Sequence, residues 1–539
     1  MNQKKSSGNS EVKSQRVWRN GFLFGCLLFS YPILSFFWRH SYPVFAIESL
    51  GFFAAVFILS ALLVIVIQYA HKIVSTLLVA GMVAITFALQ FNMGLTEMVI
   101  VAVVVTLLHL LLDQKFFKCC LPVLAMLIVG ALFDSRDSSD RIDQLAKTQS
   151  DHNGLPPIVH IILDGFIGMG GLPDYPSSAL IKNEVEGFFT QYEFQLFPRA
   201  YSRYITTVDS LYSAFKFKDD KVSRYSLEIE AGENHVMKQN SVFDALQKLG
   251  YRFNIYQTDH LDFCQSHRDA LDRCWNYGQP NVDSIRYAKS IPMRIQMLAK
   301  VMLGQFDLFN SISKRRFSPQ HVAIHNPNVF SNLQGDLVSR PDGNVFFAHV
   351  LLPHSPYTYL NDCSVSYGFD PMITRAGYVF EPIREEAIYE TRWGLYFEQV
   401  ECALNSMRKL FDEMKNVGIL GRSIIVVHGD HGSMIGKYLA IFRLRDQILA
   451  RDYLSDYSTL FAVKLPGGQT DNDDRILPLS FLLKEYINTV EALISGDGTN
   501  QAFMQTLEGD PEELTPHVYL SSSVPLMRVD INIFDNNRP

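Results

Sequence analysis

IVHIILDG (Ile158–Gly165) is the first of three apolar segments of this chain that end in residues suited to metal chemistry. The other two are NVFFAHVLLPHSPY (Asn344–Tyr357) and SIIVVHGDHG (Ser423–Gly432). Each is rich in Val, Ile or Phe, which is typical of a buried β-strand. Because the carboxyl ends of parallel strands lie at one edge of an open sheet, we expect the Asp and His side chains to meet there. The three segments therefore predict a metalloenzyme with an α/β fold.

The residues around these segments alternate between expected strands and expected helices. Ser241 is placed to cap a helix that ends at Gly250, and a strand is expected at Tyr251–Asp259. A long helix is expected at Phe397–Val417, and a further strand at Thr459–Leu465. Strand–helix–strand units of this length predict a mostly parallel sheet with helices on both faces.

The first quarter of the chain is apolar and almost free of charge. A bilayer span needs roughly 20 apolar residues, so the sequence predicts about five transmembrane helices. They are expected at Gly21–Trp38, Val44–Tyr69, Ile73–Phe91, Met98–Leu112 and Phe116–Phe133. The first is not a cleavable signal peptide, because its apolar run is too long and further spans follow at once.

Basic residues before the first span predict the orientation of the chain. Lys4, Lys5, Lys13, Arg16 and Arg19 favour a cytoplasmic N-terminus in the inner (cytoplasmic) membrane. An odd number of spans then places everything after residue 133 on the extracytoplasmic, periplasmic side. We expect a cytoplasmic tail, a multi-pass transmembrane domain, a juxtamembrane linker and a catalytic domain, at residues 1–20, 21–133, 134–157 and 158–539.

Composition and cysteine spacing fit an exported domain. The formal net charge of −7 argues against an electrostatic nucleic-acid binder. Cys264 and Cys274 flank a short polar loop, and in an oxidising compartment we expect a disulfide there, the alternative being two unpaired thiols. Cys363 and Cys402 could also pair, although nothing in their spacing favours it.

The residues at the strand ends indicate the kind of metal. Asp164 and Asp430 offer hard oxygen ligands, and His431 offers a borderline nitrogen. This mixed set suits Zn²⁺ or Mn²⁺ better than Ca²⁺, and Zn²⁺ better than Mn²⁺. An Asp-Gly after a strand is by itself a common turn. Three such ends in one domain favour a metal site over three turns.

At this point the chain resembles the alkaline phosphatase/sulfatase superfamily. The resemblance lies in LDG, in the H-x-x-x-x-H of FAHVLLPHSPY and in GDHG, in that order. The apolar helices that precede them resemble the membrane-bound branch of the superfamily. That branch includes lipopolysaccharide phosphoethanolamine transferases and lipoteichoic acid synthases. The resemblance implies a sulfatase-like fold and a metal-dependent phosphotransferase or hydrolase.

The nucleophile of this branch is a threonine at the start of a helix, in a pattern like T-x-x-S-[VL]. The segment RYITTVDSLYSAF matches the pattern from Thr207 to Leu211. A hydroxyl at a helix N-terminus is well placed to receive a phosphoryl group. Thr206 is the alternative, one residue away. Both threonines and Ser210 could instead simply cap the helix expected at Leu211–Phe217.

The resemblance also implies a role for each matching residue. Asp164, Thr207, Asp430 and His431 would bind the metal, and Thr207 would also attack the substrate. His349 and His354 would bind the substrate, with His354 also catalytic, as a proton donor or a stabiliser of charge. His349 could instead be a buried strand histidine. His160 lies inside the first strand and is expected in the core.

The sequence differs in three ways from the superfamily members that it resembles. The phosphoethanolamine transferases carry Glu at the position of Asp164. They also place a further histidine after the GDHG pair, whereas here none follows until His517, so one metal or two stays open. The signature C/S-x-P-x-R is missing around Thr207, which argues against a formylglycine sulfatase.

The implied reaction moves a phospho-head group from a phospholipid donor to an envelope glycan or lipid acceptor, through a phospho-threonine. Membrane anchoring suits a lipid donor, because it holds the site near the bilayer. Two alternatives stay open. One is a membrane-anchored phosphodiesterase or sulfatase-like hydrolase, with water as the acceptor. The other is a non-catalytic envelope regulator that binds lipid or a partner protein.

Overall fold

A computed structural model of the chain separates it into two compact units. The first unit combines Met1–Ser139 with Asn281–Ser318, and the second combines Asp140–Pro280 with Pro319–Pro539. The structure describes residues 3–39, 42–91, 95–112, 115–133, 141–142, 154–217, 236–237, 239–258, 261–277, 285, 291–304, 326–365, 373–374, 377–378, 386–435, 450–468, 470–496, 503, 517–520 and 527–530.

The first unit contains a helix at each expected membrane segment. These helices are α1 (Gln3–Arg39), α2 (Ile47–Tyr69), α3 (Lys72–Phe91), α4 (Leu95–Leu112) and α5 (Lys115–Phe133). Within the described residues, two stretches are long and apolar enough to cross a membrane, Trp18–Arg39 and Ile47–Tyr69. The apolar parts of α3 and α4 are shorter, so the structure supports two candidate spans and not the predicted five.

A helix from the middle of the chain also belongs to this first unit. It is α10 (Ile291–Gly304), which the sequence analysis assigned to the catalytic domain at 158–539. Leu298 is fully buried, and Met297 and Val301 are nearly so. A Cβ added at Gly51 of α2 would lie 3.2 Å from Ile295, so the two helices pack closely. The chain therefore contributes to the first unit twice.

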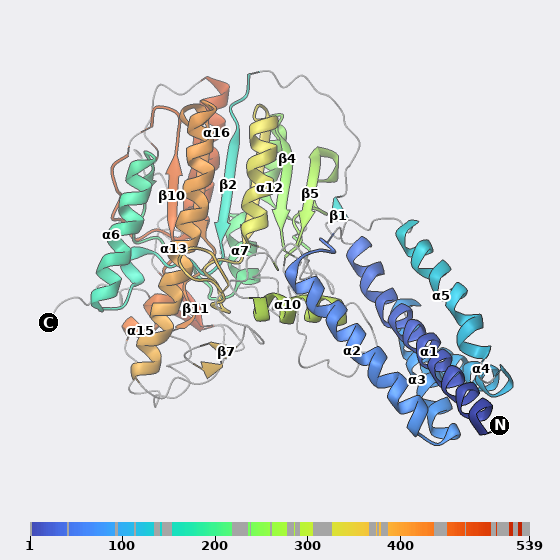
Figure 1. The fold of residues 1–539 in the computed structure, drawn as a ribbon. Coiled ribbons are helices and arrows are strands. Elements are labelled where there is room, and N and C mark those ends of the chain that lie inside the picture. The colour runs from blue at the N-terminus through green and yellow to red at the C-terminus, as the bar shows by residue number, and fades with distance from the viewer. Residues whose placement is uncertain are drawn as a thin grey trace. The chain divides into compact units, whose positions relative to one another are not determined.

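The second unit is built on a mixed, mostly parallel sheet (Figure 1). Its strand order is β1-β5-β4-β6-β2-β9-β10-β3 among the described residues. The five strands from β5 to β9 are parallel to one another, β1 is antiparallel to β5, and β10 is antiparallel to both β9 and β3. The strands are β1 (Arg141–Ile142), β2 (Ile158–Leu163), β3 (Gln195–Leu196), β4 (Arg252–Gln257), β5 (Leu271–Asn276), β6 (Asn344–Val350), β9 (Ile424–Gly429) and β10 (Phe461–Lys464).

The antiparallel direction of β10 has a local cause. This is the strand expected at Thr459–Leu465, in a sheet that the sequence predicted as mostly parallel. Backbone hydrogen bonds from Gly432 to Asp456 (2.9 Å) and from Ser433 to Ser455 (2.8 Å) hold the end of helix α15 (Ala450–Tyr457) beside the turn that follows β9. Because β10 starts from that end of β9, it can only run back along it.

Helices cover both faces of the sheet, as the sequence predicted. On one face, α7 (Thr207–Lys216), α9 (Ser241–Lys248) and α16 (Leu479–Ser495) contact one another and share a core with the strands. The helices α6 (Pro176–Gln191), α12 (Asn326–Ser339) and α13 (Glu386–Asn416) form a second connected group, and α12 contacts β4 and β6.

Helix α9 has a different N-cap from the expected Ser241. Asn240 precedes the helix, and its side chain accepts a hydrogen bond from the backbone N–H of Phe243 at 3.0 Å.

Short elements complete the described unit: the 3₁₀ turns η1 (Met169–Gly171), η3 (Arg268–Ala270) and η6 (Leu420–Arg422) and the two-stranded sheets β7 (Ile373–Thr374) with β8 (Gly377–Tyr378) and β11 (His517–Leu520) with β12 (Met527–Asp530).

The second unit contains two disulfide bonds. Cys264 pairs with Cys274, which confirms the expected bridge. Cys363 pairs with Cys402, the pair that the sequence left open. The second bond joins the segment after β6 to helix α13.

Candidate metal centre

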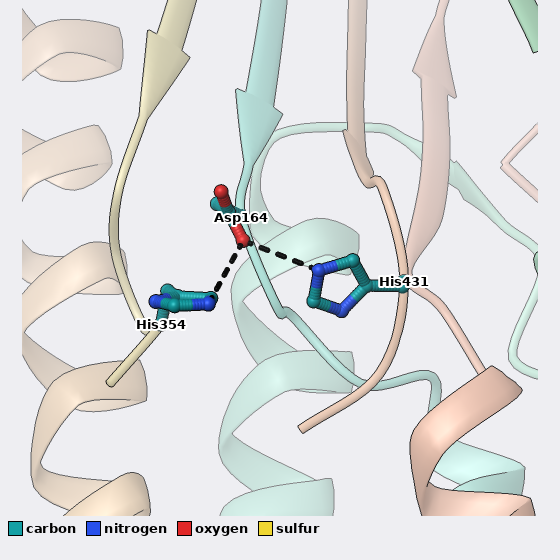
Figure 2. A group of neighbouring side chains, drawn as sticks. All are labelled: Asp164, His354 and His431. Atoms are coloured by element: carbon teal, nitrogen blue, oxygen red, sulfur yellow. Dashed lines mark ion pairs between the residues drawn. The ribbon is translucent and has the colours of Figure 1, made fainter. Parts of the chain in front are cut away.

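The candidate site lies where β2, β6 and β9 end. In the sheet register, Leu163 of β2 is level with Val350 of β6 and Gly429 of β9. The chain continues from these three strands into Asp164, the loop to His354, and His431. Figure 2 shows the carboxylate of Asp164 between the two imidazole rings. The strand ends therefore converge as the sequence predicted.

These three side chains form a candidate ligand group. Oδ1 of Asp164 lies 3.6 Å from Nε2 of His431 and 3.9 Å from Nε2 of His354. The three candidate ligand atoms all lie within 4.8 Å of one another. Asp164 and His431 are fully buried, whereas the His354 side chain is 28% exposed. His354, expected to bind substrate, is thus also close enough to Asp164 to share a metal ion.

Backbone carbonyls determine which ring nitrogen of each histidine is protonated. Nδ1 of His431 lies 2.7 Å from the carbonyl oxygen of Gly432, and Nδ1 of His354 bonds the carbonyl of Ser355. A carbonyl can only accept, so each Nδ1 donates, and in a neutral ring Nε2 then carries a lone pair. Both lone pairs are directed at Asp164. Since a lone pair and a carboxylate repel each other, a cation between them fits this arrangement.

Asp430 adds a second carboxylate. Its Oδ1 accepts hydrogen bonds from the backbone N–H groups of Gly165 and His431, both at 2.8 Å. Its Oδ2 lies 3.3 Å from Nε2 of His431. Within the described part of the chain, neither this Oδ2 nor Oδ1 of Asp164 has a hydrogen-bond donor, although both are buried. Buried carboxylate oxygens without donors are what a divalent cation would satisfy.

Burial and neighbouring charges move the two carboxylates in opposite directions. Burial raises the pKa of Asp164, but the positive charge that His354, His349 and His431 carry when protonated outweighs it and holds that pKa well below its usual range. Burial and the adjacent Asp164 raise the pKa of Asp430. An anionic Asp164 at neutral pH is the form that binds metal.

Thr207 is the hydroxyl that faces this group. It is the first residue of α7, and its Oγ1 donates to Oδ2 of Asp164 at 3.2 Å. The same oxygen lies 3.3 Å from Nε2 of His431. The Thr206 hydroxyl instead donates to Asp209 at 2.6 Å, and it makes no side-chain cap bond to the helix. Of the two threonines that the sequence left as alternatives, Thr207 contacts Asp164 and Thr206 contacts Asp209.

His349 lies in strand β6, close to Asp164. It is fully buried, and its Nε2 is 3.5 Å from Oδ2 of Asp164. His160 and His428 lie nearby on the same sheet face, and their Nε2 atoms are 2.8 Å apart. His160 is thus in the core, as expected, and the role of His349 as a substrate ligand stays a prediction.

The structure also shows contacts that the sequence did not indicate. The Tyr396 hydroxyl of α13 donates to the carbonyl of Gly165 at 3.0 Å and accepts from the N–H of Ile167 at 2.8 Å, so it holds the turn that follows Asp164. Ser210 of α7 donates to the backbone carbonyl of Asp430 at 2.5 Å. Both contacts join segments far apart in the chain, and no local pattern indicates them.

No family model and no curated protein matches the sequence. The fold is similar to solved structures. One is the C-terminal periplasmic domain of EcEptC from Escherichia coli in complex with Zn, at 12% identity and a TM-score of 0.42, covering 73% of this chain and 96% of that chain. Another is the lipoteichoic acid synthase LtaP from Listeria monocytogenes, at 15% identity and a TM-score of 0.36, covering 70% and 81%.

A third similar structure is the phosphonate monoester hydrolase of Agrobacterium radiobacter, at 11% identity and a TM-score of 0.40, covering 68% of this chain and 79% of that chain. Sulfatases are also among the similar structures.

Proposed function

We propose that this chain is a membrane-anchored, metal-dependent transferase. It moves a phospho-head group from a phospholipid donor to an envelope glycan or lipid acceptor, and Thr207 carries the group in between. The observation that supports this most directly is the Thr207 hydroxyl, which lies 3.2 Å from Asp164 and 3.3 Å from His431. A nucleophile in contact with a ligand set is the arrangement that covalent phosphoryl transfer needs.

Asp164, Asp430, His431 and Thr207 would hold the metal, with Zn²⁺ favoured over Mn²⁺ by the imidazole ligand. His354 would either complete the ligand set or contact the substrate. A bound divalent ion would polarise a phosphoryl oxygen and lower the pKa of the attacking hydroxyl.

Thr207 begins the first half of the reaction. Oγ1 loses its proton to solvent and attacks the phosphorus of the donor. The new bond joins Oγ1 to phosphorus, and the bond from phosphorus to the diacylglycerol oxygen breaks. The diacylglycerol oxygen then takes a proton. His354 can deliver it in its protonated form, because its partly exposed ring exchanges protons with solvent.

The second half returns the enzyme to its starting state. A hydroxyl or phosphate oxygen of the acceptor attacks the phosphorus, the bond to Oγ1 breaks, and Thr207 regains a proton from solvent. His354 is reprotonated by the proton of an acceptor hydroxyl or by solvent. If water attacks instead, the same site is a phosphodiesterase. The first half-reaction is common to both outcomes.

We further propose that the chain is a multi-pass inner-membrane protein. In this topology the spans follow a cytoplasmic N-terminus and place the catalytic domain in the periplasm. The two candidate spans support membrane insertion. The two disulfide bonds of the second unit support an oxidising compartment. A membrane-held site is also where a lipid donor is most concentrated.

Mass spectrometry of the full chain tests this proposal. Purified protein in detergent is incubated with Zn²⁺ and a bacterial phospholipid mixture, and the peptide that contains Thr207 is analysed beside Thr207→Ala and Thr206→Ala variants. We expect a head-group adduct on Thr207 in the wild type and in Thr206→Ala, and none in Thr207→Ala. Phospholipid consumed with free head group released would favour the hydrolase. A zinc-loaded protein with neither adduct nor consumption would favour the non-catalytic regulator.

A further inference from the structure

His349 is a polar side chain in an apolar part of the sheet. It lies in β6 level with Ile162 of β2, two residues before Asp164 on the neighbouring strand. The ring is fully buried, and the phenyl ring of Phe263 lies 6.0 Å away. Together these contacts place the imidazole between the hydrophobic core and the metal centre.

Asp164 offers the ring an acceptor within reach. In the described part of the chain neither of its nitrogens forms a hydrogen bond. A buried N–H left without an acceptor costs about 1–3 kcal/mol. Oδ2 of Asp164 lies 3.5 Å from Nε2, at the outer limit of hydrogen-bond distance. Hydrogen bonds at catalytic sites are often long until the site is loaded, so this oxygen is the natural acceptor.

The two oxygens of Asp164 face different partners. Oδ2 meets Nε2 of His349 and the hydroxyl of Thr207. Oδ1 meets the Nε2 atoms of His354 and His431. A donor on Oδ2 therefore determines which way the carboxylate is turned, and it leaves Oδ1 to the ligand group.

We propose that His349 is a positioning residue that donates its Nε2–H to Oδ2 of Asp164 and so presents Oδ1 to the metal. The proposal rests on the metal site of the proposed function and replaces the substrate-binding role that the sequence resemblance implied. Because the His349 ring is fully buried and lies next to Asp164, its effect on the substrate is transmitted through Asp164. Outer partners of metal ligands typically contribute 10- to 100-fold to metal affinity.

Zinc binding to the full chain in detergent tests the proposal. Metal-stripped wild type, His349→Leu, His349→Gln and Phe347→Leu are titrated with Zn²⁺ against a chromophoric chelator. Their melting temperatures are measured without metal, and kcat and KM are measured with a soluble phosphodiester. Gln places an N–H near the position of Nε2, whereas Leu removes it. Phe347 lies on the same strand and face and is fully buried, so its substitution controls for packing.

We expect His349→Leu to bind zinc about 10- to 100-fold more weakly than the wild type, with kcat restored by excess zinc and KM little changed. His349→Gln should recover most of the affinity. Phe347→Leu should lower the melting temperature and leave zinc affinity as it is.

Two results would overturn the positioning role alone. In one, zinc affinity is unchanged in His349→Leu and KM rises, which is the behaviour of a substrate ligand. In the other, His349→Leu, His349→Gln and Phe347→Leu all weaken zinc binding in proportion to their loss of stability. A wild type that binds no divalent metal would instead remove the metal site of the proposed function, and the positioning role with it.

Discussion

At the scale of single residues, the candidate metal centre brings several hydrogen-bond acceptors close together. Nε2 of His354 and of His431 face Oδ1 of Asp164, and the second oxygen of Asp430 faces His431. Each of these atoms is an acceptor when the rings are neutral. A cation would turn several repulsive contacts into attractive ones, and this is why binding should stabilise the fold as well as enable chemistry.

Zinc should therefore raise the melting temperature of the second unit. A ligand that binds only the folded state contributes about 2.7 kcal/mol at 100 times its Kd. Differential scanning fluorimetry of the metal-stripped chain in detergent, with and without Zn²⁺, measures this shift. We expect His431→Ala to lose the shift and Thr206→Ala to keep it. An equal shift in both variants would place zinc elsewhere.

At the scale of elements, β2 and β9 are joined by a pair of buried histidines. Nδ1 of His428 donates to the carbonyl of Gly429 at 2.7 Å, so its Nε2 accepts from Nε2 of His160. Both rings are thus held in neutral form. Burial lowers the pKa of His160, and burial together with His349 lowers the pKa of His428 from 6.5 to about 4.

This pair should make the folded protein sensitive to acid. The unfolded chain protonates both histidines near their ordinary pKa of 6.5, whereas the folded chain keeps them neutral. Because the unfolded state binds more protons below that pH, the free energy of unfolding should fall as pH drops from 6.5 towards 4, by about 1.4 kcal/mol per pH unit for His428, and His160 should act in the same direction. The stabilising contribution is complete above pH 6.5.

Denaturant unfolding at several pH values in the presence of a chelator measures this slope. The double variant His160→Gln, His428→Gln should show a shallower pH dependence than the wild type. The chelator removes the separate effect of proton–metal competition. Equal slopes for the two proteins would exclude the pair as the source.

The disulfide between Cys363 and Cys402 connects two other elements. It ties helix α13 to the segment that follows His354, across a sequence separation of 39 residues. Closing a loop of that size stabilises a fold by about 4 kcal/mol in the chain-entropy description. A Cys363→Ser, Cys402→Ser variant should lose about that much in denaturant unfolding, and the Cys264, Cys274 pair, 10 residues apart, should contribute about 3 kcal/mol. A larger loss from the shorter loop would contradict this order.

At the scale of the whole molecule, helix α10 makes the boundary between the units discontinuous. The helix lies within the 158–539 segment that the sequence predicts as one domain, but its buried residues pack in the first unit. A fragment that starts at residue 154 would therefore lack α2, against which α10 packs.

Such a fragment should aggregate or bind membranes. We expect residues 154–539 to sediment with phospholipid vesicles, and a matched fragment with Met297→Ser, Leu298→Ser and Val301→Ser to stay in the supernatant. Co-sedimentation followed by gel analysis distinguishes them. A soluble, monomeric unsubstituted fragment would show that α10 does not need the first unit.

The sequence by itself determined the strands and the residues that end them. Runs such as Ile158–Leu163 and Ile424–Gly429 are local patterns, and parallel pairing brings their ends to one edge. This is why Asp164, Asp430 and His431 could be placed together without a structure. The motif spacing that the chain shares with a known superfamily added Thr207 and His354.

Only the tertiary structure decided the orientation and partners of these side chains. It turned Thr207 rather than Thr206 towards Asp164, placed His349 behind the carboxylate and joined Tyr396 to the turn after β2. In the structure β10 also runs antiparallel to β9, and α10 belongs to the first unit. The physical reason is common to all of them. Strand formation depends on neighbours along the chain, whereas each of these contacts depends on the packing of segments far apart in the sequence.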